Sequence, residues 1–299
     1  MTPAESVPDI AHVERIGAPG VEPRLLIEVP HGADRRAHYD AWRRKLVGTL
    51  PPDLHCFFHV NTDVGAWQYG RRVAERVAAA RADVGVLLIR CLVPRTFIDT
   101  NRVPDAPDAL ASGGMTPALA PYVEAAEDRA LLIGAHRTYV DLVARAYELV
   151  CGAGGFALSP HTYGPRTLAI SKIDHEIVDA LRRAHEPAAI EAAPLRPELD
   201  LITRRPDGAR VAPDGIVEEL IARYAKIGVT ATESATYKMS EATQSWRWQL
   251  GYPQQVLCLE VRRDLLVATW TPFEEQTVKE TAADRFAGPL AEAISARLP

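Results

Sequence analysis

The alternation of short apolar runs with longer amphipathic stretches is the feature that most constrains the fold of this chain. Runs typical of strands lie at 24–30, 55–60, 84–90, 96–100, 155–160, 199–203, 229–234 and 255–261. Stretches with helical spacing lie between or after them, at 37–50, 65–82, 116–152, 214–228 and 271–298. Several of the runs are almost wholly apolar, as in strands that are covered on both faces. This order predicts an α/β fold, a three-layer α/β/α sandwich around a central mixed, mostly parallel sheet.

No repeat, low-complexity tract or linker divides the 299 residues. We therefore expect a single domain over 1–299, with residues 1–22 as an N-terminal extension. The stretch 102–119 is rich in Pro and Gly. It is the strongest candidate for a loop and could form a lid over a site.

The composition excludes several classes of protein. A net charge of −5 gives no basic footprint for nucleic acid. No apolar stretch is long enough to cross a bilayer, and the N-terminus lacks the basic start and apolar segment of a signal peptide. The four cysteines form no CxxC pair, so we expect buried, reduced thiols. The expectation is a cytoplasmic protein without nucleic-acid or membrane partners, and its oligomeric state stays open.

Polar side chains gather where five of the predicted strands end: His31, Asp63, the group Asp99–Asn101–Arg102, His161 and Glu260. In open α/β sheets, ligands bind beyond the carboxyl ends of the strands. Two imidazoles and one carboxylate are a common catalytic zinc set, which leaves a fourth position for water. A further carboxylate can take a proton from that water, and an arginine can hold an oxyanion or a substrate carboxylate. The set predicts metal-assisted amide hydrolysis, although no local motif such as HExxH joins its members.

Several of these residues also have a purely structural explanation. A histidine after a strand is often only hydrogen-bonded, and Asp63 could cap the following helix. Asp99 could pair with Arg95 or Arg102. The remaining histidines with helical, charged surroundings are expected to be at the surface or hydrogen-bonded: His136, His175 and His185.

Glu260 is harder to explain in this way. Acidic residues are rarely buried in an apolar strand unless they are paired. Arg262 and Arg263 follow it closely and could be the partners.

Four segments resemble the N-formylglutamate amidohydrolase family. They are "EVPHG" (28–32), "NTD" (61–63), "PRTFIDTNR" (94–102) and "LEVRRDL" (259–265), in the family's order, and the resemblance runs from about residue 25 to 270. The segment "PRTFIDTNR" is the most specific of them. Its Asp-x-Asn-Arg element is also similar to that of zinc carboxypeptidases and acyl-amino-acid deacylases of the same fold.

The resemblance implies a zinc carboxypeptidase-like, or phosphorylase/hydrolase-like, fold and a zinc-dependent hydrolase of linear amide C–N bonds. The substrate would be an N-acyl amino acid, N-formyl-like, or a related small carboxylate amide. The implied residues are His31, Asp63 and His161 as ligands of one Zn²⁺; Glu260 as general base and then acid; Arg95 to polarise the scissile carbonyl or hold a second acidic group; and Asn101, Arg102 and Arg166 to bind the substrate.

The chain departs from the family's pattern in two places. The family's second histidine lies in an Asp-x-His-Ser context, whereas this chain has "SPHT", so that Ser159 stands where the family has Asp. The family's Asn-x-Pro-x-x-Gly-Gly segment has no counterpart. The stretch 235–253, rich in Trp and Tyr, occupies that region and would form a wall of the substrate pocket.

Some alternatives stay open from the sequence. Asp34 creates a local His-x-x-Asp and competes with Asp63 as the third ligand, although we favour Asp63. The acyl group and the amine are not fixed. The same residues would also suit a carboxypeptidase-like zinc peptidase, and the fold would also suit a catalytically silent binding scaffold.

Overall fold

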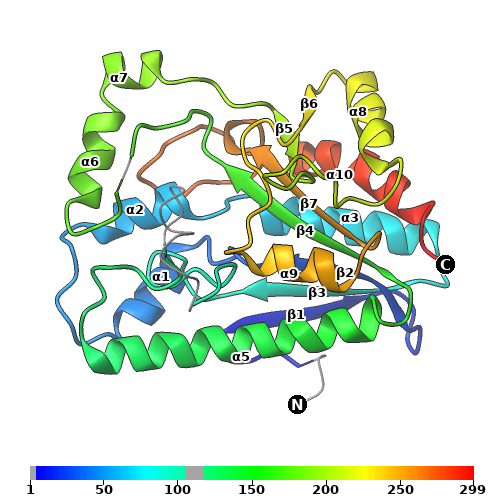
Figure 1. Cartoon of the computed structure of the whole chain (residues 1–299), viewed down its shortest axis with the longest axis horizontal. Coiled ribbons are helices and arrows are strands. Elements are labelled where there is room, and N and C mark those ends of the chain that lie inside the picture. The colour runs from blue at the N-terminus through cyan, green and yellow to red at the C-terminus, as the bar shows by residue number, and fades with distance from the viewer. Residues whose placement is uncertain (1–4, 105–116, 171) are drawn as a thin grey trace.

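The computed structural model describes residues 5–104, 117–170 and 172–299, and within these it shows one seven-stranded sheet (Figure 1). The spatial order of the strands is β1-β3-β2-β4-β7-β5-β6. The β1/β3 and β5/β7 pairs are antiparallel and the other pairs are parallel, which confirms the mixed, mostly parallel sheet. The strands are β1 (Ala11–Ile16), β2 (Pro23–Val29), β3 (Gly85–Cys91), β4 (Phe156–Tyr163), β5 (Leu199–Leu201), β6 (Ala231–Glu233) and β7 (Val256–Arg262).

The helices that surround the sheet differ in length. The two longest are α5 and α10. The helices are α1 (Arg36–Arg43), α2 (Leu54–Asn61), α3 (Ala66–Ala80), α5 (Ala126–Val150), α6 (Ile177–Ala184), α7 (Pro187–Ala192), α8 (Ile216–Lys226), α9 (Gln244–Gly251), the 3₁₀ turn η1 (Arg263–Leu265) and α10 (Glu280–Ser295).

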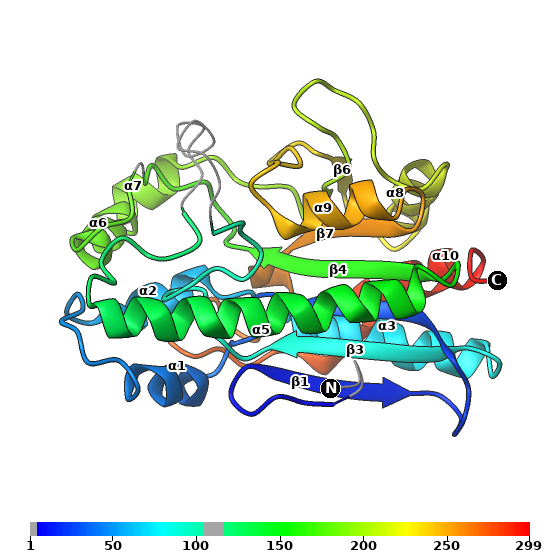
Figure 2. The same cartoon turned by 60° about the horizontal axis from the view of Figure 1, so that its bottom comes forward.

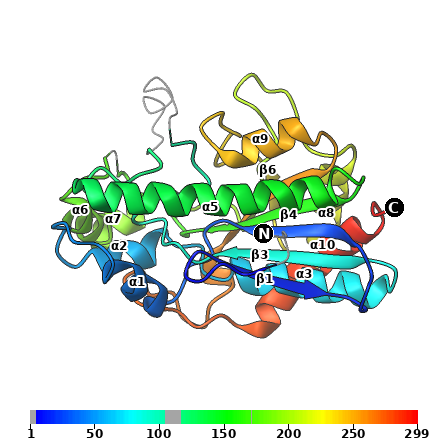
Figure 3. The same cartoon turned by 90° about the horizontal axis from the view of Figure 1, so that it is seen from below.

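Strand β2 shows why the molecule has three layers. Its side chains alternate between the two faces of the sheet, yet nearly all of them are buried. Leu25, Ile27 and Val29 pack into the core beneath α3, α8 and α10, whereas Leu26 packs into the core beneath α5. Figures 2 and 3 show α5 along one face of the strands and α3 and α10 on the other side. The predicted α/β/α sandwich is therefore confirmed.

Four of the shorter helices lie together at one end of the sheet. α1, α2, α6 and α7 gather beyond the arrowheads of β3 and β4, which are the carboxyl ends of these strands (Figures 1 and 2). Helix α2 packs against α6 at this end. These helices and the loops beside them surround the place where an α/β sheet presents its ligand-binding residues.

Two of the predicted strands are wrong. Residues 55–60 belong to helix α2, because a short apolar run fits a buried helix as well as a strand, and Leu54, Phe57 and Phe58 bury one side of it. Residues 96–100 form a turn instead of a strand, and only Ile98 makes an isolated bridge, to Leu119.

Other predicted boundaries also change. Helix α5 begins at Ala126 and not at 116, and α10 begins at Glu280 and not at 271 and contains Pro289. Most of the predicted loop 102–119 lies outside the described residues, so its proposed action as a lid remains a prediction. The predicted N-terminal extension contains β1, which forms one edge of the sheet. No helix in the described ranges has the length and apolar character needed to cross a membrane.

Candidate metal centre and active site

His31 lies just beyond the end of β2, in a tightly packed turn. Thr100 donates a hydrogen bond from Oγ1 to the carbonyl of Pro30, at 2.9 Å. A Cβ at Gly32 would lie 2.5 Å from Cγ of Arg90, so that a side chain there would force its neighbours to shift. The turn therefore holds the imidazole of His31 at a fixed position, and His31 is buried.

Asp63 reaches the same place from the loop between α2 and α3. It follows a helix and not the predicted strand. Thr62 donates from Oγ1 to the carbonyl of Ala33 at 2.7 Å, which joins this loop to the turn that carries His31. Gly65 then starts α3 with a φ of 90°, a left-handed conformation that favours glycine.

His31, Asp63 and His161 form the tightest cluster of potential metal ligands in the described residues. Nδ1 of His31 lies 3.1 Å from Oδ2 of Asp63, and Nδ1 of His161 lies 2.9 Å from the same oxygen. The two Nδ1 atoms are 3.3 Å apart. All three side chains are buried, and they come from the end of β2, the loop before α3 and strand β4. The structure therefore brings together the three residues expected from the sequence to be metal ligands.

The other nitrogen of each ring also has a hydrogen-bond partner. Nε2 of His31 lies 2.7 Å from Oδ1 of Asp99, and an ionised carboxylate only accepts, so this Nε2 carries a proton. Nε2 of His161 lies 3.3 Å from Oγ of Ser159, which donates its own proton to Glu28. Both Nδ1 atoms face the same carboxylate oxygen of Asp63, and a metal ion bound there would replace the protons that these hydrogen bonds require.

This arrangement fits a bound zinc ion. With bonds of about 2.0–2.1 Å, neighbouring ligand atoms of tetrahedral zinc lie about 3.3–3.4 Å apart, close to the spacings between these three atoms. The two Nδ1 atoms are held 3.3 Å apart beside one carboxylate oxygen, a spacing that a shared cation would stabilise. In addition, Oδ1 of Asp63 is buried without a hydrogen bond from the described residues.

Asp34 pairs with two arginines and not with the histidines of the cluster. Its Oδ1 lies 2.5 Å from Nη2 of Arg90 and 3.8 Å from Nε of Arg35. Arg90 also donates from Nε to the carbonyl of Gly32. Asp34 thus fixes the turn around His31, and the geometry favours Asp63 as the carboxylate of the cluster.

Glu260 lies beside the cluster on strand β7, directly opposite His161 of β4 in the sheet register. Its Oε2 is buried and has no hydrogen-bond partner among the described residues. Burial raises the pKa of Glu260, the positive charge of His161 opposes this shift, and the carboxylate of Asp63 adds to it. Neither predicted ion pair forms within 4.0 Å, since Arg262 pairs with Asp264 and Arg263 approaches Asp63.

Arginines surround the carboxylates of the cluster. Arg95 lies between two of them, with Nη2 2.9 Å from Oδ2 of Asp99 and Nη1 3.6 Å from Oδ1 of Asp63. Arg102 is farther away, with Nε 3.8 Å from Oδ2 of Asp99. Although burial would raise the pKa of Asp99, His31 and Arg95 hold that pKa well below its usual range. Asp99 therefore stays ionised as the partner of His31.

Asn101 joins the site to α9. Its Oδ1 accepts hydrogen bonds from N and Oγ of Ser245, at 3.0 and 2.9 Å.

The residue after Asn101 contacts His136 of α5. The carbonyl of Arg102 lies 2.8 Å from Nε2 of His136, which is buried and hydrogen-bonded, as expected. The segment 235–253 thus contacts the "DTNR" turn through α9, and its role as a pocket wall stays a prediction.

Arg166 is not brought to the cluster by any of its hydrogen bonds. Its Nη1 donates to the carbonyls of Glu191 and Ala193, around the end of α7. These contacts hold the polypeptide after β4 against α7. A role of Arg166 in substrate binding remains a prediction.

Two features of the site were missed from the sequence. Arg263 is buried beneath the cluster, where it donates to the carbonyl of Thr162 and lies 3.5 Å from Oδ1 of Asp63. Burial lowers its pKa to about 10. The second feature is the hydrogen-bonded group Glu28–Ser159 behind His161. Its sequence signal was the single acidic residue in the apolar run 24–30.

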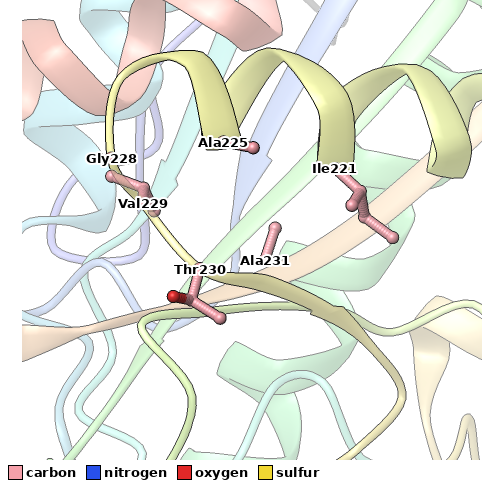
Figure 4. Close-up of a pocket in the computed structure, with 6 residues that line it drawn as sticks. All are labelled: Ile221, Ala225, Gly228, Val229, Thr230 and Ala231. Atoms are coloured by element: carbon pink, nitrogen blue, oxygen red, sulfur yellow. The ribbon is translucent and has the colours of Figure 1, made fainter.

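A pocket on the opposite part of the sheet has no such chemistry. It lies between α8 and β6, and no titratable side chain lines it (Figure 4). Its lining residues are Ile221, Ala225, Gly228, Val229, Thr230 and Ala231.

Comparison with known proteins identifies similar structures at low identity. No family model and no curated protein matches the chain. Gene product Atu2144 from Agrobacterium tumefaciens is 15% identical, with a TM-score of 0.50 over 96% of this chain and 94% of that chain. An N-formylglutamate amidohydrolase from Ralstonia eutropha JMP134 is 16% identical, with a TM-score of 0.49 over 95% of this chain and 96% of that one. A metallo-carboxypeptidase from Burkholderia cenocepacia is 11% identical, with a TM-score of 0.40 over 95% of this chain and 60% of that one.

At 15% identity, the likeness to the Agrobacterium protein shows a shared fold and leaves the reaction open.

Proposed function

We propose that this chain is a zinc-dependent amidohydrolase that cleaves a small N-acyl amino acid or a related carboxylate amide. The observation that carries the proposal is the cluster of His31, Asp63 and His161, in which two Nδ1 atoms and one carboxylate oxygen face a common point. The four segments that resemble the amidohydrolase family support the choice of an amide substrate.

The three side chains would hold one zinc ion and leave a position open for substrate or water. A zinc ion in such a site lowers the pKa of water and polarises a carbonyl group. The protein supplies a buried surrounding, in which Asp99 orients His31 and Arg263 offsets part of the negative charge of Asp63.

Glu260 is the candidate general base and acid. A general base needs a carboxylate oxygen that is close to the reacting water and not already hydrogen-bonded, and Oε2 of Glu260 meets the second condition. Its raised pKa also suits a group that first accepts a proton and then returns it to the leaving nitrogen. Its position opposite His161 in the sheet supports both roles.

Positive charge beside the cluster favours a substrate with a free carboxylate. Arg102 is poorly paired, because its buried Nε has no hydrogen bond from the described residues and its distance to Asp99 is 3.8 Å. Arg95 is a quarter exposed in its side chain and lies between Asp63 and Asp99. We assign Arg102, with Asn101, to the substrate carboxylate and Arg95 to the scissile carbonyl.

The test is hydrolysis of a panel of N-formyl and N-acetyl amino acids and short peptides by the zinc-loaded protein. Release of free amine is measured for the wild type, for metal-free protein and for Glu260→Gln. We expect the zinc-loaded wild type to cleave at least one N-acyl amino acid, and the other two preparations to be nearly inactive.

Each of the other possible outcomes would indicate a different function. Preferential cleavage of peptides would indicate a carboxypeptidase-like peptidase. Zinc binding without turnover of any compound would indicate a binding scaffold that has kept its metal site.

A further inference from the structure

The buried face of helix α9 is largely polar. Residues four apart lie on the same side of a helix, and in α9 the pairs Gln244/Trp248 and Ser245/Gln249 form one such side. Gln244, Ser245 and Gln249 are at most 4% exposed, whereas the apolar Leu250 is 51% exposed. A surface helix normally turns its apolar side inward, so packing alone does not explain this orientation.

Several polar atoms of this face have no hydrogen bond from the described residues. Neither Oε1 nor Nε2 of Gln249 is paired. Gln244 donates from Nε2 to the carbonyl of Arg102 at 3.3 Å, but its Oε1 is unpaired. Trp248 stacks on Tyr147 of α5 with ring centroids 4.7 Å apart, and both Nε1 of Trp248 and Oη of Tyr147 are unpaired. Buried polar atoms in native proteins nearly always have a partner, so this face is suited to a polar ligand.

The polar face of α9 lies beside the candidate active site. Helix α9 packs on β7 and lies near α5 (Figure 2). At its first turn, Ser245 is hydrogen-bonded to Asn101. Trp246 packs with Cys258 of β7, which is two residues before Glu260 and on the same face of the strand, a distance of about 6.6 Å along it. A substrate whose carboxylate is held at Asn101 would therefore extend its side chain along α9.

The charges around this face favour a neutral group. The one charged residue of α9, Arg247, is exposed. Burial raises the pKa of Tyr147, and the nearby carboxylate of Glu28 raises it further. A second carboxylate bound here would gain no positive partner from α9 and would be repelled by Glu28. A carboxamide both donates and accepts hydrogen bonds, as does Gln249, so the two groups can pair.

We propose that the inner face of α9 is the side-chain subsite of this enzyme, and that Gln249 and Tyr147 there select substrates whose side chain ends in a carboxamide. This inference rests on the proposed function and narrows its substrate to N-acyl derivatives of glutamine or asparagine. An apolar side chain would leave the buried atoms of Gln249 unpaired, and an acidic one would bring an uncompensated charge.

The test compares three substrates with side chains of similar length: N-formylglutamine, N-formylglutamate and N-formylmethionine. The zinc-loaded wild type is assayed with each for release of free amine. We expect kcat/KM for N-formylglutamine to exceed that for each of the other two by at least about a hundredfold, because a site built to hydrogen-bond a substrate group strongly rejects analogues without it.

The main variant is Gln249→Met, which keeps the length of the side chain and removes both polar atoms. The preference for N-formylglutamine over N-formylmethionine should fall at least about tenfold, while zinc content and the rate with N-formylmethionine stay near the wild-type values. Damage to the fold would lower all rates together, so the ratio separates recognition from structure. Tyr147→Phe should reduce the same ratio by a smaller factor.

The matched control is Gln254→Met. Gln254 lies in the turn before β7 begins, where its Oε1 accepts from N of Asp214 at 2.6 Å. The same chemical change there should leave all three rates and their ratios unchanged.

Several results would overturn the subsite. They are a wild type that cleaves N-formylglutamate or N-formylmethionine as well as N-formylglutamine, and a Gln249→Met variant with an unchanged ratio. If Gln249→Met does not fold, an unchanged ratio in Tyr147→Phe has the same meaning.

Failure of the proposed function gives a different result. If the zinc-loaded wild type cleaves none of the three compounds, the proposed function is contradicted, and calorimetry tests the subsite on its own. N-formylglutamine should then still bind the wild type at least about tenfold more tightly than it binds Gln249→Met. Equal affinities, or no binding to either protein, would overturn the subsite as well.

Discussion

Two clusters of charged side chains in this molecule differ in how completely they are paired. At the sheet edge beyond β5, Glu233 accepts hydrogen bonds from Arg210 through both carboxylate oxygens, at 2.6 and 2.8 Å. Thr203 donates a further hydrogen bond to Oε1 of Glu233, and Arg204 donates one to Oε2. At the candidate active site, by contrast, polar atoms of three residues are buried without a hydrogen bond from the described residues: Oδ1 of Asp63, Nε of Arg102 and Oε2 of Glu260.

The difference separates a cluster that stabilises the fold from one that is prepared for a ligand. A buried polar atom without a partner costs about 1–3 kcal/mol, so three such atoms in one place oppose folding. Native structures keep few of them, and those that remain usually have a functional reason. The saturated cluster around Glu233 has no such unpaired atom on its carboxylate, and no function needs to be assigned to it.

Loss of a metal ligand should have the largest effect. We expect His161→Ala to weaken zinc binding at least about a hundredfold, because one of a few ligands supplies about 3–4 kcal/mol of the binding free energy. Equilibrium dialysis with elemental analysis measures this. His175→Ala, at an exposed histidine that is hydrogen-bonded to Glu124 away from the cluster, is the control and should bind zinc normally. Equal zinc binding by both variants would remove His161 from the ligand set.

Loss of the unpaired carboxylate should stop turnover without affecting the metal. Glu260→Gln keeps the shape of the side chain but cannot accept the proton, so kcat should fall by about 10²- to 10⁴-fold. Zinc content should stay at the wild-type level. Glu241→Gln, at an exposed glutamate, is the matched control. A variant that keeps its rate would show that Glu260 is not the base.

Replacing an arginine in each cluster compares the two directly. Arg102→Met should raise KM by about 10- to 100-fold for an N-acyl amino acid, since a charged hydrogen bond is worth about 1.5–3 kcal/mol. Arg210→Met removes a guanidinium from the saturated cluster and should leave KM unchanged. The assignment of Arg102 would be contradicted if the two variants had the same KM.

The smallest effect concerns the saturated cluster. The hydrogen bonds from Arg210 lower the pKa of Glu233 to about 2, below its usual value of 4.5. Its contribution to stability is therefore complete above about pH 4.5 and is lost as the pH falls toward 2. We expect Glu233→Gln to reduce the free energy of unfolding by about 1 kcal/mol at pH 7, given that its arginine partners are about one-third exposed. Urea titrations at pH 7 and pH 3.5 should show this difference shrinking, and a difference that grows in acid would refute the assignment.

The layers of the fold could be predicted from the sequence because they depend on hydrophobic periodicity. Runs such as 24–30 and 84–90 are buried on both faces, and only a sheet covered on both sides accommodates that pattern. Residues 55–60 were misassigned because a short apolar run contains no period that distinguishes a buried helix from a strand.

The grouping of His31, Asp63 and His161 was also predicted from the sequence, first from the ends of predicted strands and then from segments that resemble a family. The chain itself separates these residues by 32 and 98 positions along the sequence, so spacing alone could not show that they meet. The partners of the histidines were not predicted. Asp99 was expected to pair with Arg95 or Arg102, and Glu28 was seen only as an interruption of an apolar run, because contacts between segments far apart in the sequence cannot be read from either segment alone.

The central claim is that these three side chains bind a metal, and one measurement tests it most directly. Crystals of the protein loaded with one equivalent of zinc are measured on both sides of the zinc absorption edge. The account predicts one anomalous peak per chain that contacts Nδ1 of His31, Nδ1 of His161 and Oδ2 of Asp63. A peak at Asp34, a peak on the Nε2 atoms, or no peak at the cluster would contradict it.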